Sequence, residues 1–166
     1  ALLEVAGIGV MLAGRSGAGK SECALELVTR GYRLVADDAV DLAIEDGVLW
    51  GRAAPAVRDH LEIRGLGILS IPELYGADAV TGSAEVALVC SLEKDPGPQD
   101  RTGLERATES LLGVDVPRVT LHTHPHAGAS TATLVDAAVR DTLRRRDGHF
   151  AAERFDEHLR ALLRQR

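Results

Sequence analysis

The chain has 166 residues, carries 19 Lys and Arg against 25 Asp and Glu, and has a formal net charge of −6. This length suits one globular domain with a sizeable core, and 45% hydrophobic residues exclude a disordered chain. No apolar run approaches the ~18 residues that a membrane span needs, and the acidic balance does not favour nucleic-acid binding. We expect a single domain over residues 1–166 that binds neither a membrane nor a nucleic acid.

Cysteine usage indicates a reducing compartment. Cys23 and Cys90 are the only two cysteines, too few for the disulfide framework of a small secreted domain, and the start of the chain has no signal-peptide pattern. The apolar start at Ala1 is typical of a fragment cut at a domain boundary. We expect two reduced core thiols in a cytoplasmic protein.

Hydrophobic patterning predicts an α/β domain. Apolar residues at helical spacing predict a helix from Ser21 to Arg30, with Gly31 as its C-terminal cap. In the C-terminal third, two apolar stripes at helical spacing predict two more helices. The expected strands are 8–13, 33–36, 40–44, 48–50, 85–91 and 118–123, with Asp46-Gly47 joining 40–44 to 48–50 as a hairpin turn. Strands that alternate with helices and hairpins indicate the α/β class.

A glycine-rich loop lies between the strand expected at 8–13 and the helix that follows. Its eight residues match the phosphate-binding pattern G-x-x-x-x-G-K-[ST] in full, and with 2 Lys in the chain roughly 0.002 such matches arise by chance. Backbone N–H groups of such a loop bind phosphate oxygens, aided by the helix N-terminus. We expect Lys20 to reach the β- and γ-phosphates and the Ser21 hydroxyl to bind Mg²⁺. The loop consists of Gly14, Arg15, Ser16, Gly17, Ala18, Gly19, Lys20 and Ser21.

Two carboxylates, Asp37 and Asp38, follow the strand expected at 33–36. A nucleotide-dependent kinase needs one acidic group near Mg²⁺ and another that takes the proton of the attacking hydroxyl. A turn or helix cap is the alternative interpretation, because Asp is common in both. The residues alone leave open which of the two aspartates is the base.

Three segments of the chain resemble the catalytic domain of the HPr kinase/phosphorylase family. The first runs from the glycine-rich loop through Glu22-x-Ala-Leu-Glu-Leu27 to Arg30-Gly-x-Arg-Leu-Val-Ala-Asp-Asp38. The second is Leu61-Glu62-Ile63-Arg64-Gly65-Leu66-Gly67-Ile68, and the third is Asp100-Arg101-x-Gly103-Leu104-Glu105. They occur in the family's order, and the resemblance extends over residues 1–140.

The resemblance implies an activity and a set of roles. The family phosphorylates a serine of the phosphocarrier protein HPr with ATP or pyrophosphate, and reverses this step by phosphorolysis. Its pattern implies that Lys20 is catalytic, that Asp38 is the base, and that Arg101 stabilises the transferring charge. Mg²⁺ would lie between Ser21 and Glu62. The family also implies a phosphoenolpyruvate-carboxykinase-like P-loop fold and a homo-oligomer, usually a hexamer.

Two features depart from the family pattern. A catalytic histidine of the family would fall just before Ala1, so we expect this chain to lack it together with the family's N-terminal domain. A family loop that carries paired Arg or Lys is replaced here by His122-Thr-His-Pro-His-Ala-Gly128. Histidines that are mostly neutral at pH 7 offer less fixed positive charge, so we expect phosphorolysis to be slower than phosphorylation. A metal site in this segment is the alternative, but no second His or Cys cluster completes it.

Other interpretations remain open for the function and for the basic end of the chain. A related P-loop kinase with a different substrate and a non-catalytic nucleotide sensor both fit the phosphate loop, although the complete set of site residues favours catalysis. Residues 140–166 hold 8 Arg against 5 acidic residues. This segment either docks a protein partner or forms a solvated face.

Overall fold

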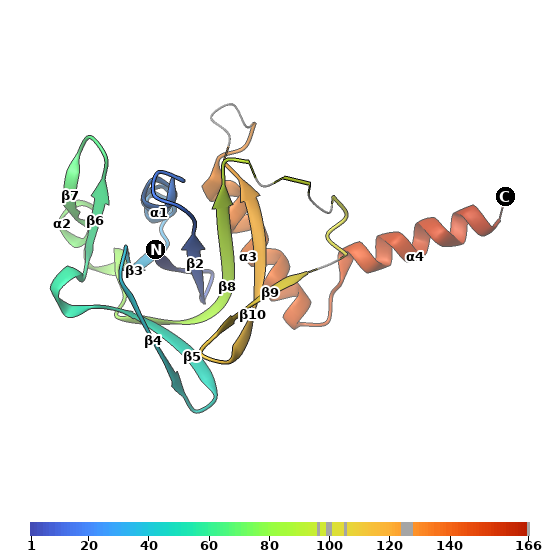
Figure 1. Cartoon of the computed structure of the whole chain (residues 1–166), viewed down its shortest axis with the longest axis horizontal. Helices are drawn as coiled ribbons and strands as arrows, with labels where there is room; N and C mark the ends of the chain where they lie inside the picture. Colours follow the sequence, from blue (N-terminus) through green and yellow to red (C-terminus); the bar gives the residue numbers. More distant parts are fainter. Residues whose placement is uncertain (96, 99–100, 105, 124–127, 166) are drawn as a thin grey trace.

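The computed structural model describes residues 1–95, 97–98, 101–104, 106–123 and 128–165. These residues form an eight-stranded sheet in the order β3-β1-β2-β8-β10-β9, with the β4–β5 hairpin attached to β8, and a separate pair β6–β7 (Figure 1). The strands are β1 Leu2–Val5, β2 Ile8–Ala13, β3 Arg33–Ala36, β4 Val40–Glu45, β5 Val48–Ala53, β6 His60–Ile63, β7 Gly67–Ser70, β8 Ser83–Glu93, β9 Ala107–Leu111 and β10 Val114–His122. The helices are α1 Lys20–Thr29, α2 Ile71–Tyr75, α3 Thr131–Arg146 and α4 Ala151–Arg164, with 3-10 turns at Pro55–Val57 and Ala77–Ala79.

Strand β8 lies at the centre of the fold. It pairs in parallel with β2 and β10 and antiparallel with β5. Its residues from Ala84 to Leu92 are buried apart from Glu85, so the strand is almost continuously apolar instead of alternating. This pattern is typical of a strand that is covered on both faces of its sheet. The carboxyl ends of β2 and β8, which lead into the functional site, are therefore held rigidly side by side.

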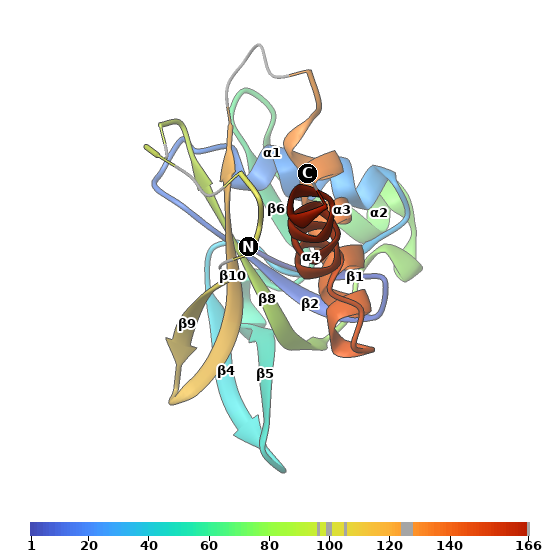
Figure 2. The same ribbon diagram turned by 90° about the vertical axis from the view of Figure 1, so that its right-hand side faces the viewer.

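Two hydrophobic clusters cover the two faces of the sheet. Helices α1 and α3 pack on one face, and the other face carries the β4–β5 hairpin, as Figure 2 shows. Both cysteines are free and lie in the first cluster, Cys23 on α1 and Cys90 on β8. Burial raises the pKa of each thiol to about 12. The cysteines therefore behave as core residues, as the sequence predicts.

The predicted α/β class with C-terminal helices is confirmed. Strands β2 and β3 have the expected bounds, and the expected helix begins one residue earlier, at Lys20. Asp46 and Gly47, which join β4 to β5, both have positive φ, as the hairpin prediction requires. The sequence analysis missed β1, β6, β7, β9 and the helix α2, each of which has only four or five residues, too few to establish a period.

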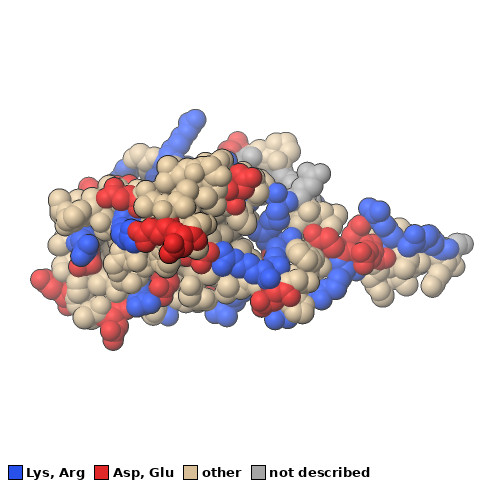
Figure 3. Space-filling model, turned by 90° about the horizontal axis from the view of Figure 1, so that it is seen from below, with Lys and Arg blue, Asp and Glu red and all other residues tan. Residues whose placement is uncertain are grey.

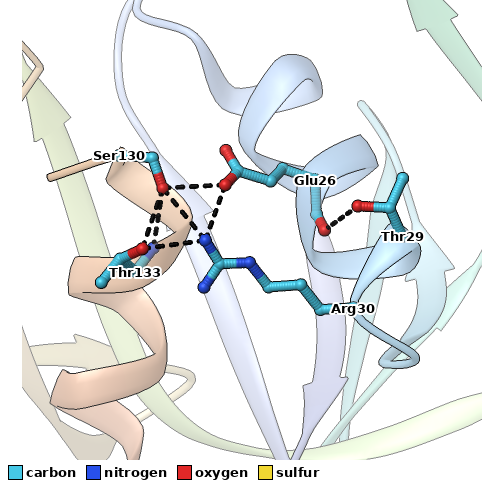
Figure 4. A network of polar contacts seen from close by, with 5 residues as sticks. All are labelled: Glu26, Thr29, Arg30, Ser130 and Thr133. Atoms are coloured by element: carbon cyan, nitrogen blue, oxygen red, sulfur yellow. Dashed lines mark hydrogen bonds and ion pairs between the residues drawn. The ribbon is translucent and has the colours of Figure 1, made fainter.

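A polar network joins the end of α1 to the start of α3 (Figure 4). Arg30 donates from Nη2 to Oε1 of Glu26 at 2.7 Å and to Oγ1 of Thr133 at 2.8 Å. Ser130 donates to the same Glu26 oxygen at 2.8 Å and also caps α3 by accepting from the Thr133 backbone N–H. Helix α3 thus starts at a fixed position beside the helix that follows the phosphate loop.

Helix α4 extends away from the sheet and α1 (Figure 1). Its apolar stripe is present as predicted and stays uncovered in the described chain, where Phe155 is 70% exposed and Leu163 is 62% exposed. Figure 3 shows charges of both signs along the face of α4 that is turned to the viewer. None of the helices in the described ranges has the length and apolar character that a bilayer crossing requires.

Candidate functional site

The glycine-rich loop leaves the carboxyl end of β2 and leads directly into α1, which is the strand–loop–helix context that the phosphate-binding motif requires. Gly14 has φ +147° and lies so close to β8 that a Cβ there would be 2.6 Å from the Leu92 carbonyl oxygen. Gly19, the residue before α1, has φ 95°. Both positions therefore need glycine, so the conformation of this loop depends on its glycines.

Lys20 is the first residue of α1, and its side chain turns back toward the loop. Its Nζ donates to the Gly14 carbonyl at 2.8 Å and to the Arg15 carbonyl at 3.1 Å. The N-terminal end of a helix also presents backbone N–H groups and a positive dipole. The ammonium group and the helix end thus lie together at the loop, an arrangement that suits an anion with several oxygens.

Asp37 connects three parts of the site. The Ser21 hydroxyl donates to its Oδ1 at 3.2 Å, and the Glu62 backbone N–H donates to its Oδ2 at 3.0 Å. The residue is 7% exposed, whereas the neighbouring Asp38 is exposed. One buried carboxylate therefore fixes the start of α1 and strand β6 relative to the end of β3.

The predicted site residues Lys20, Ser21, Asp38 and Glu62 line one cavity of 490 Å³. Its other walls come from the phosphate loop, Glu22 and Arg64. A second cavity of 630 Å³ borders the same loop beside the end of β8. Its lining consists of Gly14, Arg15, Ser16, Ala18, Leu92, Glu93, Lys94 and Asp95. The loop therefore contributes to two cavities, and the chain's two lysines line one each.

The donor atoms around Ser21 are suited to Mg²⁺. The Ser21 hydroxyl and the carboxylates of Asp37, Asp38 and Glu62 offer only oxygen, which is the ligand type that Mg²⁺ prefers. In the part of the chain that the structure describes, no group of three or more His, Cys, Asp or Glu side chains is placed to hold a metal ion by itself. Mg²⁺ commonly binds through one or two protein ligands with phosphate and water oxygens completing its shell, and the residues here fit that mode.

The structure does not bring every predicted residue to this site. Arg101 is exposed and lines neither cavity beside the loop. In Figure 1 the described parts of the chain between β8 and β9 lie away from α1, toward α4. His124 and His126, on which the expectation of slower phosphorolysis rests, lie outside the described residues.

Sequence reasoning also missed functional candidates. Arg64 and His60 line cavities at the site although the sequence analysis gave them no role. Their signal was the alternation of polar and apolar residues from His60 to Arg64, which places both on the same side as Glu62. Asp37 was a candidate from the sequence, but its bridging role gave no such signal, because its two hydrogen-bond partners are distant in the sequence.

Comparisons with known proteins match nearly the whole chain. The sequence profile described as the HPr Serine kinase C-terminal domain matches residues 1–159. The HPr kinase/phosphorylase of Bacillus licheniformis is 45% identical over 161 residues, which cover 95% of this chain and 51% of that protein. The corresponding protein of Leptospira biflexa serovar Patoc is 40% identical over 169 residues, which cover 99% of this chain and 52% of that protein. The chain thus spans about half the length of these relatives.

A solved structure shows the same fold. The structure of the Hpr(Ser) kinase/phosphatase from Coxiella burnetii matches with a TM-score of 0.81 and 34% sequence identity. The match covers 95% of this chain and 96% of that one. Because the family profile and the relatives match nearly the whole chain, this protein belongs to the HPr kinase/phosphorylase family, within the region described as the HPr Serine kinase C-terminal domain.

Proposed function

We propose that this chain catalyses the Mg²⁺-dependent transfer of a phosphoryl group from ATP or pyrophosphate to a serine of an HPr-like phosphocarrier protein. One observation carries the proposal: an exposed carboxylate, Asp38, lines the same cavity as Lys20, Ser21 and Glu62. Phosphoryl transfer depends on positioning and on charge stabilisation, with a carboxylate placed to accept the proton of the hydroxyl. The names of the relatives supply the acceptor and the class of reaction.

The two cavities at the loop suggest how the donor lies. The loop and Lys20 would hold the phosphates, and Ser21 and Glu62 would hold Mg²⁺, which commonly keeps phosphate and water oxygens among its ligands. The nucleoside of ATP occupies the 630 Å³ cavity beside the end of β8, where Glu93 and Asp95 offer acceptors for ribose hydroxyls. Pyrophosphate has no nucleoside and would need only the loop and Lys20, not the 630 Å³ cavity. One site would therefore serve both donors.

We assign different roles to the two aspartates. Both oxygens of Asp37 accept hydrogen bonds within the protein, so this residue positions Ser21 and Glu62. Asp38 is exposed, and we propose it as the base that takes the serine proton in the forward direction and returns it during phosphorolysis. Arg64 lines the donor cavity and stabilises negative charge there, whereas Arg101 would need a movement of its segment to do so.

We further propose that the enzyme is a cytoplasmic homo-oligomer. The apolar stripe of α4 is exposed in a single chain, and a second copy would cover it. Two free, buried thiols are consistent with a reducing compartment.

The direct test incubates the full chain with ATP, Mg²⁺ and HPr and detects phosphoserine by mass spectrometry. We expect phosphoserine on HPr with the wild-type protein and with Asp41→Asn, a control change at an exposed carboxylate of β4. Lys20→Ala should form phosphoserine about 10²–10³-fold more slowly. ATP consumption without phosphorylated HPr would identify a kinase with another acceptor, and nucleotide binding without turnover would identify a sensor.

A further inference from the structure

The outward face of the β6–β7 hairpin carries a large exposed aliphatic residue beside the proposed metal ligand. The antiparallel register places Ile68 directly opposite Glu62. Leu61 and Ile63, which alternate with Glu62 along the strand, are buried in the core on the other face. Ile68 is 74% exposed. Packing within the described chain therefore does not account for an isoleucine at this position.

Ile68 contributes to a third cavity, of 350 Å³. Its apolar wall comes from side chains of the β3–β4 connection, the 3-10 turn at Pro55–Val57, and β7. Its polar side consists of carboxylates and one histidine. The lining residues are Asp37, Asp38, Ala39, Ala56, Val57, His60, Glu62 and Ile68. Exposed aliphatic side chains that gather around a cavity are typical of a surface that binds another molecule.

This cavity shares two residues with the cavity at the phosphate loop. Asp38 and Glu62 line both, so they form a common wall between them. The donor phosphates enter from the side of the loop. A hydroxyl that is to meet the phosphoryl group at Asp38 must therefore approach from the other side, where the 350 Å³ cavity lies. The residues next to the acceptor serine have to be accommodated there.

The charges of the cavity disfavour an acidic neighbouring residue, and its apolar wall favours an aliphatic one over an uncharged polar one. Three carboxylates line it, and no Lys or Arg belongs to its described lining. An acidic residue beside the serine would be repelled by these carboxylates, and a polar one would lose water contacts against Val57 and Ile68. An aliphatic side chain would bury apolar surface at no such cost.

We propose that this cavity is an acceptor subsite, which binds an aliphatic side chain adjacent to the phosphorylated serine, with Ile68 and Val57 as specificity residues. The inference rests on the proposed kinase function and goes further by stating what the acceptor must present. The carboxylate wall makes the subsite selective as well, because it disfavours acceptors with an acidic residue beside the serine.

The first experiment measures HPr phosphorylation kinetics for Ile68→Ser and Val57→Ser in the full chain. Ile44→Ser is the matched control, since Ile44 is an aliphatic strand residue that is 46% exposed and lines none of the three cavities. We expect the KM for HPr to rise about tenfold in the two subsite variants, because apolar contact is lost, while kcat stays near wild type. The Kd for Mg²⁺-pyrophosphate should be unchanged in all three, which also shows that the variants are folded.

A second experiment tests the contact from the acceptor side. Each residue flanking the acceptor serine of HPr is replaced in turn by Ser and by Asp. At one flanking position, both replacements should raise the KM of the wild-type enzyme, Asp more than Ser. With the Ile68→Ser enzyme, the Ser replacement at that position of HPr should raise the KM only slightly further, because the two changes remove the same contact.

The outcomes separate the two proposals. Phosphorylation of HPr with unchanged KM in Ile68→Ser and Val57→Ser would overturn the subsite alone. The same conclusion would follow if the KM increases caused by Ile68→Ser and by the HPr replacements were additive in free energy at every flanking position. A wild-type chain that binds Mg²⁺-pyrophosphate but never phosphorylates HPr would overturn the kinase proposal and the subsite with it.

Discussion

Neighbouring residues of the same type occupy very different environments in this site. Asp37 is buried and accepts two hydrogen bonds from elements far apart in the sequence. Asp38, the next residue, is exposed on the wall between the donor cavity and the proposed acceptor subsite. A buried carboxylate whose oxygens are already occupied suits positioning, and an exposed one suits proton transfer.

Substituting the two aspartates should therefore give different kinetic results. Asp38→Asn removes a base and should lower kcat by about 10²–10⁴-fold with little change in nucleotide affinity. In Asp37→Asn the amide nitrogen cannot accept one of the two hydrogen bonds, so stability should fall by about 1–3 kcal/mol and the Mg²⁺ requirement should rise. Steady-state kinetics across a Mg²⁺ titration and urea denaturation measure both effects. If Asp37→Asn lost kcat strongly while the kcat of Asp38→Asn stayed at the wild-type value, Asp37 and not Asp38 would be the base.

Lys20 and Glu62 should act on the donor and the metal. Lys20→Ala should lower kcat about 10²–10³-fold, because a charged donor to the phosphate oxygens is lost, while the circular dichroism spectrum stays that of the wild type. Glu62→Gln should raise the Mg²⁺ concentration for half-maximal activity, since an amide oxygen is a weaker ligand than a carboxylate. Wild-type turnover in Lys20→Ala would contradict phosphate binding at this loop.

Between elements, polar contacts hold α1 to α3. Besides the network around Arg30, the Tyr32 hydroxyl, which follows α1, donates to Oδ1 of Asp136 on α3 at 2.6 Å. This hydrogen bond, with a further contribution from Arg140, lowers the pKa of the Asp136 carboxyl from its ordinary value. The same bond raises the pKa of Tyr32. These contacts, together with the network around Arg30, hold α3 against α1.

The lowered pKa of Asp136 predicts a pH dependence of stability. On acidification the unfolded chain, in which the pKa is about 3.9, takes up this proton before the folded chain does. The stabilisation is thus fully present above the unfolded pKa and is lost as the pH falls through the lower folded value. Asp136→Asn should cost about 1 kcal/mol at pH 7 and should make the decline in unfolding free energy from pH 5 to pH 3 shallower.

Urea denaturation at a series of pH values checks this expectation. Asp115→Asn, at an exposed residue of β10, is the control and should leave the profile close to that of the wild type. An equally steep decline in Asp136→Asn would show that other carboxylates cause the loss of stability in acid.

Sequence patterns predicted elements better than they predicted contacts. The apolar run of β2, the helical stripe of α1 and the Asp46-Gly47 turn are local signals, and all three were predicted correctly. The strand–loop–helix context of the glycine-rich loop was also predicted correctly, because its glycines and Lys20 lie in one segment. The bridging role of Asp37 was not, because it depends on Ser21 and Glu62 meeting across three elements. The apolar stripe of α4 was predicted from its spacing, but no element of the described chain covers it.

For the molecule as a whole, α4 predicts self-association. Its stripe of Phe155, Leu159, Leu162 and Leu163 has no buried member. Deleting residues 149–166 should therefore weaken assembly without changing the Kd for Mg²⁺-pyrophosphate. Phe155→Ser combined with Leu159→Ser should act in the same direction, and Glu157→Gln should not. Sedimentation velocity measures the association state, and a deletion variant that assembles like the wild type would contradict the prediction.

The two buried thiols allow the opening of the core to be measured by chemical labelling. A thiol with a pKa of about 12 reacts with alkylating agents only when the structure around it opens, so the labelling rate of Cys23 and Cys90 measures the free energy of opening between α1 and β8. A ligand that binds only the closed state slows this reaction in proportion to its saturation. Thiol labelling in the presence of Mg²⁺ and pyrophosphate thus yields the affinity of the phosphate loop without any turnover, even in variants that have lost their chemistry.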